Sequence, residues 1–167
     1  MSAKGSPGTV GVVTVEATLC AIVRGGRILL QRKAAGRFGE GKWNGAGGKL
    51  KPGEDPADGV IREVLEETGL RIREPRRHGT LDHYFGDRSA PAWSVHVFSA
   101  TEFDGEPVGG EEGELRWFPV GEIPYGEMWE DDAHWLPLLL GGRDFDGAFY
   151  FNEDASVLLD HSLVVRD

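Results

Sequence analysis
Apolar and polar residues alternate over several short stretches of the chain, and this spacing is typical of β-strands. The stretches 12–23 and 27–32 flank the turn sequence Arg24-Gly25-Gly26, which predicts a hairpin. We expect four more strands, at about 70–85 and 92–100 with the polar turn Gly86-Asp87-Arg88-Ser89 between them, and near 145–151 and 157–165.

The spacing of apolar residues becomes helical after residue 55. Asp55 followed by Pro56 reads as a cap and first helical position, and Gly69 reads as the stop, so we expect a helix over about 56–68. Its buried stripe consists of Ala57, Val60, Ile61, Val64 and Leu65. A second helix is expected over about 131–141, capped by Asp131 or Asp132 and started or kinked by Pro137. This mixed order of elements predicts an α+β fold.

Three glutamates gather on one flank of the first helix, beside its apolar stripe: Glu63, Glu66 and Glu67. Glu63 and Glu67 are four residues apart and repel each other when both are ionised, so a hard divalent cation between them makes physical sense. Oxygen ligands suit Mg²⁺ or Mn²⁺ better than zinc. A solvated acidic face is the usual interpretation of such a charge run, but it explains neither the neighbouring glycines nor Arg62 among the acids.

Length and charge narrow the class of protein. The 167 residues, 40% of them hydrophobic, are expected to form one domain over 12–167, after a Gly-, Ser- and Pro-rich flexible segment at 1–11. A formal net charge of -10 argues against a nucleic-acid polymer or an anionic membrane as partner, whereas a small phosphorylated ligand stays compatible if a metal reverses the local field.

The chain shows no signal peptide and no long apolar run, so we expect a cytoplasmic protein, most simply a monomer. The single cysteine, Cys20, reads as a small buried residue, and the five histidines show no metal-binding spacing.

Residues 48–70 resemble the Nudix box. Gly48, Glu54 and the run REVLEETGL from Arg62 to Leu70 stand at the fixed positions of that motif, which spans 23 residues. The resemblance implies the Nudix fold, an α/β/α sandwich with a mixed, mainly antiparallel curved sheet. It also implies hydrolysis of a diphosphate bond with Mg²⁺, or Mn²⁺, as cofactor.

Other segments look like the branch of the family that cleaves 8-oxo-dGTP. They are Trp43–Lys49, Val95–Phe98, Ile123-Pro124, Met128–Asp132 and Trp135–Leu140. This likeness implies hydrolysis of oxidised purine nucleoside triphosphates to the monophosphate and pyrophosphate, which would cleanse the nucleotide pool. The alternative is a Nudix pyrophosphatase of normal or methylated nucleotides, dinucleoside polyphosphates or ADP-ribose. A domain that only binds nucleotides is a further alternative, against which the complete glutamate set speaks.

The resemblance assigns roles to acidic residues. Glu63, Glu66 and Glu67 are implied as metal ligands, together with the Gly47 carbonyl and Glu114, for which Glu111 and Glu112 compete. Either Glu63 or Glu67 would serve as general base, and that choice stays open. Arg62 is expected to pair with the glutamates and to hold them in orientation.

It also assigns a substrate pocket. Trp129 would stack on the purine, Asp131 and Asp132 would bond its edge, and Asn44 would bond the base, although core packing, helix capping and a turn role are the simpler alternatives. Weaker matches to pocket or phosphate-side positions are Thr18, Lys33, Phe38 and Phe85. Three departures from the branch pattern, Ala46, His83 and Trp93, suggest a reshaped pocket, so the preferred base is not determined.

Overall fold
The computed structural model describes residues 13–111 and 113–166. The expected flexible segment at 1–11 lies outside these residues, as does Glu112. No helix in the described part of the chain is long and apolar enough to cross a membrane.

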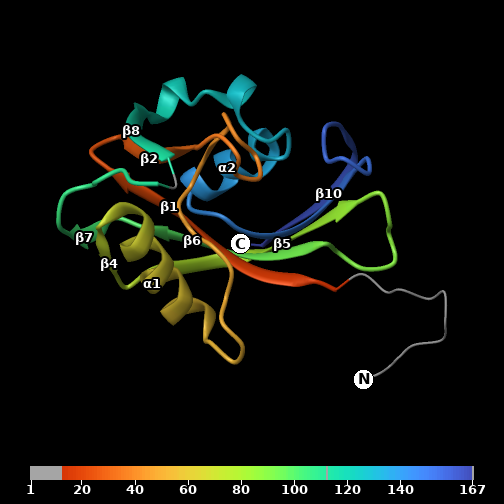
Figure 1. Cartoon of the computed structure of the whole chain (residues 1–167), viewed down its shortest axis with the longest axis horizontal. Helices are drawn as coiled ribbons and strands as arrows, with labels where there is room; N and C mark the ends of the chain where they lie inside the picture. The colour runs from red at the N-terminus through yellow and green to blue at the C-terminus, as the bar shows by residue number, and fades with distance from the viewer. Residues whose placement is uncertain (1–12, 112, 167) are drawn as a thin grey trace.

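A mixed sheet of eight strands forms the centre of the molecule (Figure 1). Its strands run in the order β10-β9-β5-β6-β1-β2-β3, with β8 on β2, and β4 and β7 form a separate pair. The strands are β1 (Val15–Arg24), β2 (Arg27–Lys33), β3 (Trp43–Asn44), β4 (Arg71–Arg73), β5 (Arg76–Phe85), β6 (Trp93–Ala100), β7 (Glu102–Asp104), β8 (Gly113–Pro119), β9 (Asp144–Phe151) and β10 (Leu158–Arg166). Only the pairs β1–β6 and β5–β9 are parallel in this sheet, which confirms the expected mixed, mainly antiparallel arrangement.

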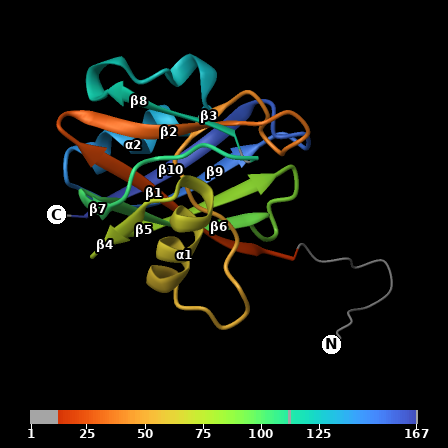
Figure 2. The same ribbon diagram turned by 60° about the vertical axis from the view of Figure 1, so that its left-hand side comes forward.

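The two α-helices, α1 (Pro56–Thr68) and α2 (Asp132–Leu140), cover opposite faces of the sheet (Figure 2). Neighbouring residues of β1 show this, because successive side chains of a strand point to opposite faces. Cys20 and Ile22 pack in the core under α1, whereas Ala21 packs in the core that contains Trp135 of α2. Two short 3-10 helices, η1 (Val120–Glu122) and η2 (Tyr125–Glu127), connect β8 to α2.

The first helix has the boundaries that its caps predict. The Asp55 carboxylate accepts a hydrogen bond from the Ala57 N–H at 3.1 Å. Gly69 adopts a left-handed φ of 79° and donates its N–H to the Leu65 carbonyl, which ends the helix. Val60 and Val64 are fully buried, so the expected apolar stripe faces the core.

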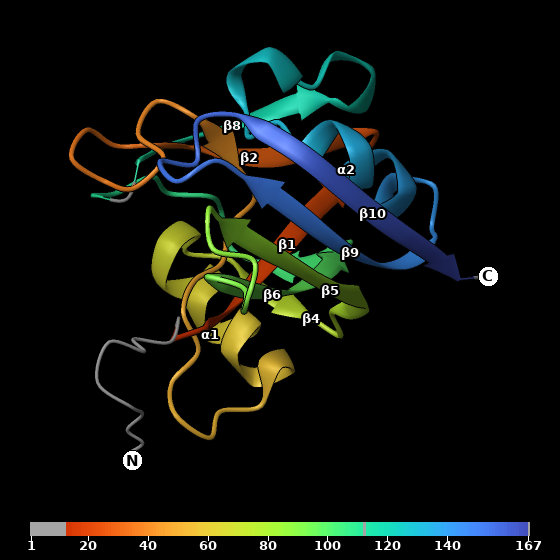
Figure 3. The ribbon, with the colours of Figure 1, turned by 90° about the vertical axis from the view of Figure 1, so that its right-hand side faces the viewer.

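The expected strand at 70–85 is two strands, and this prediction was wrong. Glu74 has a left-handed φ of 47° and Pro75 lacks an N–H, so the ladder cannot run through them. β4 pairs with β7, and β5 pairs with β6 and β9 in the main sheet. Figure 3 shows β5 lying beside β9, with β10 at the sheet edge.

Candidate active site
A cavity of about 510 Å³ is lined by residues that lie far apart in the sequence, from Ala17 to Trp135. Strands β1, β2, β5 and β6 and helices α1 and α2 all contribute side chains to it. All eight residues expected to bind substrate line this cavity: Thr18, Lys33, Phe38, Asn44, Phe85, Trp129, Asp131 and Asp132. Of the residues expected to bind metal, Gly47, Glu63 and Glu67 line it as well.

Residues 45–48 form a glycine-rich strip that runs along β1 at one end of the cavity. The Thr18 N–H donates to the Gly48 carbonyl at 2.9 Å, and the Cys20 N–H donates to the Ala46 carbonyl at 2.7 Å. Gly47 has a φ of 156°, and a Cβ there would lie 2.1 Å from the Thr18 carbonyl oxygen. Only glycine allows the strip to approach β1 this closely.

Two glutamates of α1 lie against this strip. The Gly47 N–H donates to Glu67 Oε1 at 3.0 Å, and Lys33 Nζ lies 4.0 Å from Glu67 Oε2. A Cβ on Gly48 would lie 2.4 Å from Glu63 Oε2, so the missing side chain makes room for that carboxylate. The glycines therefore bring backbone and carboxylate oxygens together at the cavity wall.

Arg62 holds the acidic side chains of the helix, as its sequence position predicts. Its guanidinium makes two hydrogen bonds to Glu54, at 2.8 and 2.9 Å, and further bonds to Glu63 at 2.9 Å and Glu66 at 3.2 Å. The hydrogen bonds from Arg62 and from the Lys51 N–H lower the pKa of Glu54 to about 2. The same bond to Glu54 raises the pKa of Arg62. The arginine relieves the repulsion between the acids that the helix spacing creates.

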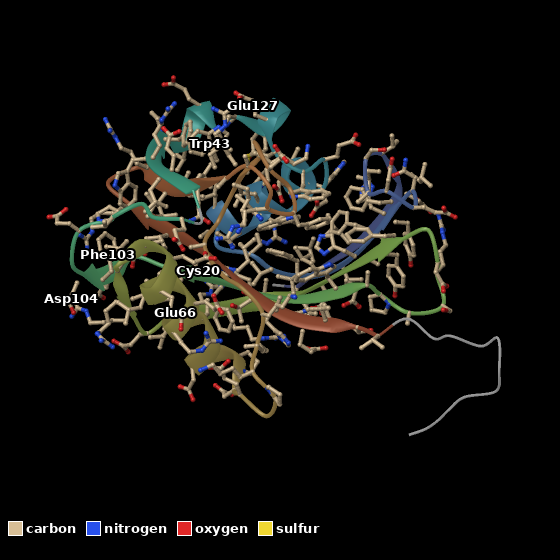
Figure 4. All side chains as sticks on the ribbon, viewed as in Figure 1. Cys20, Trp43, Glu66, Phe103, Asp104 and Glu127 are labelled. Atoms are coloured by element: carbon tan, nitrogen blue, oxygen red, sulfur yellow. The ribbon has the colours of Figure 1, made fainter. Side chains whose placement is uncertain are left out.

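The other two expected metal ligands lie outside the cavity lining. The side chain of Glu66 is 57% exposed on α1, where Figure 4 labels it. Glu114 on β8 is 49% exposed and accepts a hydrogen bond from Arg116 at 2.8 Å. Glu111 is exposed too. Within residues 13–111 and 113–166, no three His, Cys, Asp or Glu side chains are grouped so as to hold a metal ion.

Aromatic rings gather at the other end of the cavity. Measured between ring centroids, Phe38 lies 5.3 Å from Trp129, 6.1 Å from Phe85 and 6.3 Å from Trp93, and its ring plane is nearly parallel to that of Trp93. Phe38 is nevertheless 61% exposed. An exposed ring next to three others is an unusual place for a core residue, and it leaves aromatic faces available to a flat ligand.

Asp131 and Asp132 lie beside these rings and are almost fully buried. Asp131 Oδ2 receives the Trp135 Nε1–H at 3.0 Å and lies 2.9 Å from His83 Nε2. Asp132 Oδ2 is buried without a hydrogen-bond partner among the described residues. Burial and the charge of Asp131 raise the pKa of Asp132 well above its ordinary value.

Helix capping does not explain the acid pair. Asp131 stands at the N-cap of α2, but its side chain makes no capping hydrogen bond. The buried position of Asp132, with one oxygen unpartnered beside a cavity, is costly unless a ligand satisfies it.

Sequence reasoning missed some of the lining and misplaced one residue. Ala46 lies in the core under α1 and not in the cavity lining, because its position on the strip points it to the α1 side. Of the three departures, only His83 and Trp93 therefore reshape the pocket. Arg37, Lys49 and Trp135 also line the cavity, and the position of Trp135 four residues after Asp131 was the available signal for the third.

Comparison with known proteins adds to this geometry. The NUDIX domain family matches residues 13–139. The chain is 40% identical over 146 residues to the oxidized purine nucleoside triphosphate hydrolase of Mus musculus, covering 87% of this chain and 92% of that protein. The protein of the same name from Danio rerio is 39% identical, with the same coverage of both chains.

Solved structures agree. The mutator MutT protein from Bacillus halodurans superposes with a TM-score of 0.80 and 29% identity, covering 89% of this chain and 97% of that one. The fold, the position of the acidic helix and the family match over most of the length lead to one conclusion: this chain belongs to the NUDIX family.

Proposed function
We propose that this protein hydrolyses oxidised purine nucleoside triphosphates such as 8-oxo-dGTP to the nucleoside monophosphate and pyrophosphate. The proposal rests on one observation: the two ends of a single cavity are lined by chemically different groups. Glu63, Glu67 and the glycine strip line one end, and Trp129 with the Asp131–Asp132 pair lines the other. A nucleotide has the same two parts, a phosphate chain and a flat base.

The relatives support this substrate class. The proteins from Mus musculus and Danio rerio are named for hydrolysis of oxidised purine nucleoside triphosphates, and this chain spans 92% of each. His83 and Trp93 are the departures from the branch pattern that line this cavity, and a change of a few pocket contacts favours the same reaction on a related base.

The family generally depends on a divalent metal, and the donors at the acidic end fit one. Glu63, Glu67 and the Gly47 carbonyl would hold it, and Glu66 and Glu114 would join from outside the lining after side-chain movement. All of these donors are oxygens, which Mg²⁺ prefers and Mn²⁺ accepts. When bound, the ion supplies charge neutralisation to the phosphate oxygens.

The protein's own groups orient and polarise the reactants. Lys33 and Lys49 line the cavity and contribute positive charge for a phosphate chain. Glu63 or Glu67 would accept the proton of the attacking water, and Arg62 keeps the acidic side chains in place. At the base end, Trp129 would stack on the purine, Asn44 would bond it, and the acid pair would read its edge.

The test is pyrophosphate release by the purified protein across oxidised and normal nucleoside triphosphates in the presence of Mg²⁺. The proposal expects the highest kcat/KM for an oxidised purine nucleotide and loss of turnover with a chelator, restored by added Mg²⁺. A preference for dinucleoside polyphosphates, ADP-ribose or ordinary nucleotides would replace the substrate but keep the reaction class. Binding without metal-dependent turnover would make the domain a nucleotide-binding module and overturn the proposal.

A further inference from the structure
His83 is one of the departures from the branch pattern that line the base end of the cavity. It lies on β5, lines the cavity, and its side chain is 16% exposed. Its ring stacks on Phe149 with centroids 5.8 Å apart and an interplanar angle of 22°, and it lies 6.3 Å from Phe151. This packing fixes the ring so that Nε2 faces Asp131 Oδ2 at 2.9 Å.

Two donors therefore meet on one oxygen of Asp131. Trp135 Nε1 carries a hydrogen and can only donate, and it lies 3.0 Å from the oxygen that His83 Nε2 approaches. An oxygen that accepts from the indole is best satisfied when the imidazole donates to it as well. Two donated hydrogen bonds favour the ionised form of a carboxyl group.

The surroundings of Asp132, in contrast, favour its protonated form. It is as deeply buried as Asp131, its Oδ2 has no partner in the described part of the chain, and the Asp131 charge is next to it. Lys42 from the β2–β3 connection and Tyr125 from η2 are the other titratable groups that act on it, and the Lys42 charge opposes protonation. Burial and the Asp131 charge outweigh the hydrogen bonds from the Trp135 side chain and the Trp129 backbone and the charge of Lys42, and raise the pKa of Asp132.

We propose that His83 determines base specificity by holding Asp131 as the acceptor, so that the shared proton of the acid pair stays on Asp132 as the donor. This inference rests on the proposed function, since it deepens the base-reading role of the pair. His83 acts through Asp131 and is a positioning residue.

A fixed order of donor and acceptor distinguishes two kinds of purine. A 6-oxopurine presents an acceptor at position 6 beside a donor at N1, whereas a 6-aminopurine presents the reverse order. An acid pair whose proton moves freely matches both orders, and a pair locked by His83 matches one. Because 8-oxo-dGTP is a 6-oxopurine, the locked pair selects 6-oxopurines and rejects 6-aminopurines.

The experiment compares 8-oxo-dGTP with 8-oxo-dATP, which share the oxidised C8 and differ in this edge. His83→Leu removes the imidazole donor and leaves an apolar side chain in its place. It is expected to lower the ratio of kcat/KM for 8-oxo-dGTP to kcat/KM for 8-oxo-dATP by about tenfold or more. His83→Gln keeps an N–H donor and is expected to restore the ratio to within about threefold of the wild type. His161→Leu is the matched control, since His161 also stacks on Phe149 at 5.8 Å but does not line the cavity, and it should leave the ratio unchanged.

A second arm does not depend on turnover. Carboxyl ¹³C NMR at neutral pH, with signals assigned by Asp131→Asn and Asp132→Asn, should show Asp132 protonated and Asp131 ionised in the wild type. In His83→Leu both signals should move to intermediate positions, because the proton is then shared. Wild-type turnover of neither nucleotide refutes the proposed function, whereas normal 8-oxo-dGTP turnover with an unchanged ratio in His83→Leu refutes only the role of His83. Unchanged NMR signals in His83→Leu overturn the inference whatever the activity.

Discussion
Glu66 and Glu67 of α1 differ in their exposure to solvent and in the groups that contact them. Glu67 is 9% exposed, receives the Gly47 N–H and faces Lys33, whereas the Glu66 side chain is 57% exposed beside Arg62. A buried carboxylate that lines the cavity has a defined position relative to a bound ligand. Replacement of Glu67 should therefore lower the catalytic rate more than it lowers the free energy of unfolding.

Glu67→Gln should lower turnover by at least about 10²-fold, because the amide can neither accept a proton from water nor hold a cation as a carboxylate does. The fold should survive, since the amide keeps the size of the side chain. Steady-state kcat with Mg²⁺, together with a thermal unfolding curve, checks this. Glu122→Gln, an exposed change on η1, serves as control, and near-normal turnover of Glu67→Gln would remove this residue from the reaction.

Asp131→Asn and Asp132→Asn should each weaken hydrolysis of 8-oxo-dGTP more than that of 8-oxo-dATP. The reason is that an amide presents a donor and an acceptor of its own, in place of the fixed acceptor and donor that the acid pair is proposed to present to a 6-oxopurine. Trp129→Ala should weaken hydrolysis of both nucleotides, because stacking is worth about 1–3 kcal/mol per base and does not depend on the groups at the purine edge. The measurement is kcat/KM for both nucleotides. If neither aspartate variant changes their ratio, the pair does not read the base.

At the scale of elements, α1 and the glycine strip work as one unit. The strip is hydrogen-bonded to β1, the helix lies against the strip, and Arg62 links Glu54 before the helix to Glu63 and Glu66 on it. A shift of the strip or of the helix would move the carboxylates relative to the cavity wall. Substitutions that affect this packing should act on catalysis without touching substrate.

Gly48→Ala should reduce kcat by about 10²-fold, since its Cβ would lie 2.4 Å from Glu63 Oε2 and must displace that carboxylate. Gly121→Ala is the matched control, because a Cβ there meets nothing within 4 Å. Turnover and circular dichroism of both variants check the prediction. Equal activity of the two variants would show that the position of Glu63 is unimportant.

The pair of Arg62 and Glu54 should appear in the acid stability of the protein. The pKa of Glu54 is lowered to about 2 from its ordinary value of 4.5, so its carboxylate stabilises the folded state above pH 4.5. This contribution is lost as the pH falls from 4.5 through about 2. Glu54→Gln should be less stable at neutral pH and should lose less stability over that interval. Urea unfolding at several pH values measures it, and identical pH profiles for the two proteins would contradict it.

At the scale of the whole molecule, the sheet fixes the position of the acidic end of the cavity relative to its aromatic end. β1 and β6 run parallel at its centre, α1 covers one face and α2 the other, and the cavity receives side chains from both helices. In the proposed reaction, the distance between the base-binding end and the acidic end would decide which phosphorus meets the attacking water. This arrangement makes the cleavage site a property of the fold.

Hydrolysis in ¹⁸O-labelled water should place the heavy oxygen in pyrophosphate, because the proposed attack is on the β-phosphorus. Mass spectrometry of both products checks it. Label in the nucleoside monophosphate would mean attack at the α-phosphorus, and release of orthophosphate would exclude the proposed reaction.

Local signals predicted some elements closely. Asp55, Pro56 and Gly69 place both ends of α1, because caps act through bonds within a few residues, and the turn at Gly25-Gly26 predicts the β1–β2 hairpin for the same reason. The division of 70–85 into β4 and β5 was missed. It depends on the pairing of β4 with β7, about 30 residues away, which periodicity within one segment does not report.

The sequence by itself determined the family, the acidic helix and a large part of the cavity lining. These follow from motif spacing and from the resemblance over most of the chain. Only the tertiary structure decided that Ala46 faces the core and that His83 meets Asp131, 48 residues further along. The physical reason is that a side chain's partner across a sheet is set by strand register and by packing of α2 on the sheet, and these arise from the sum of many distant contacts.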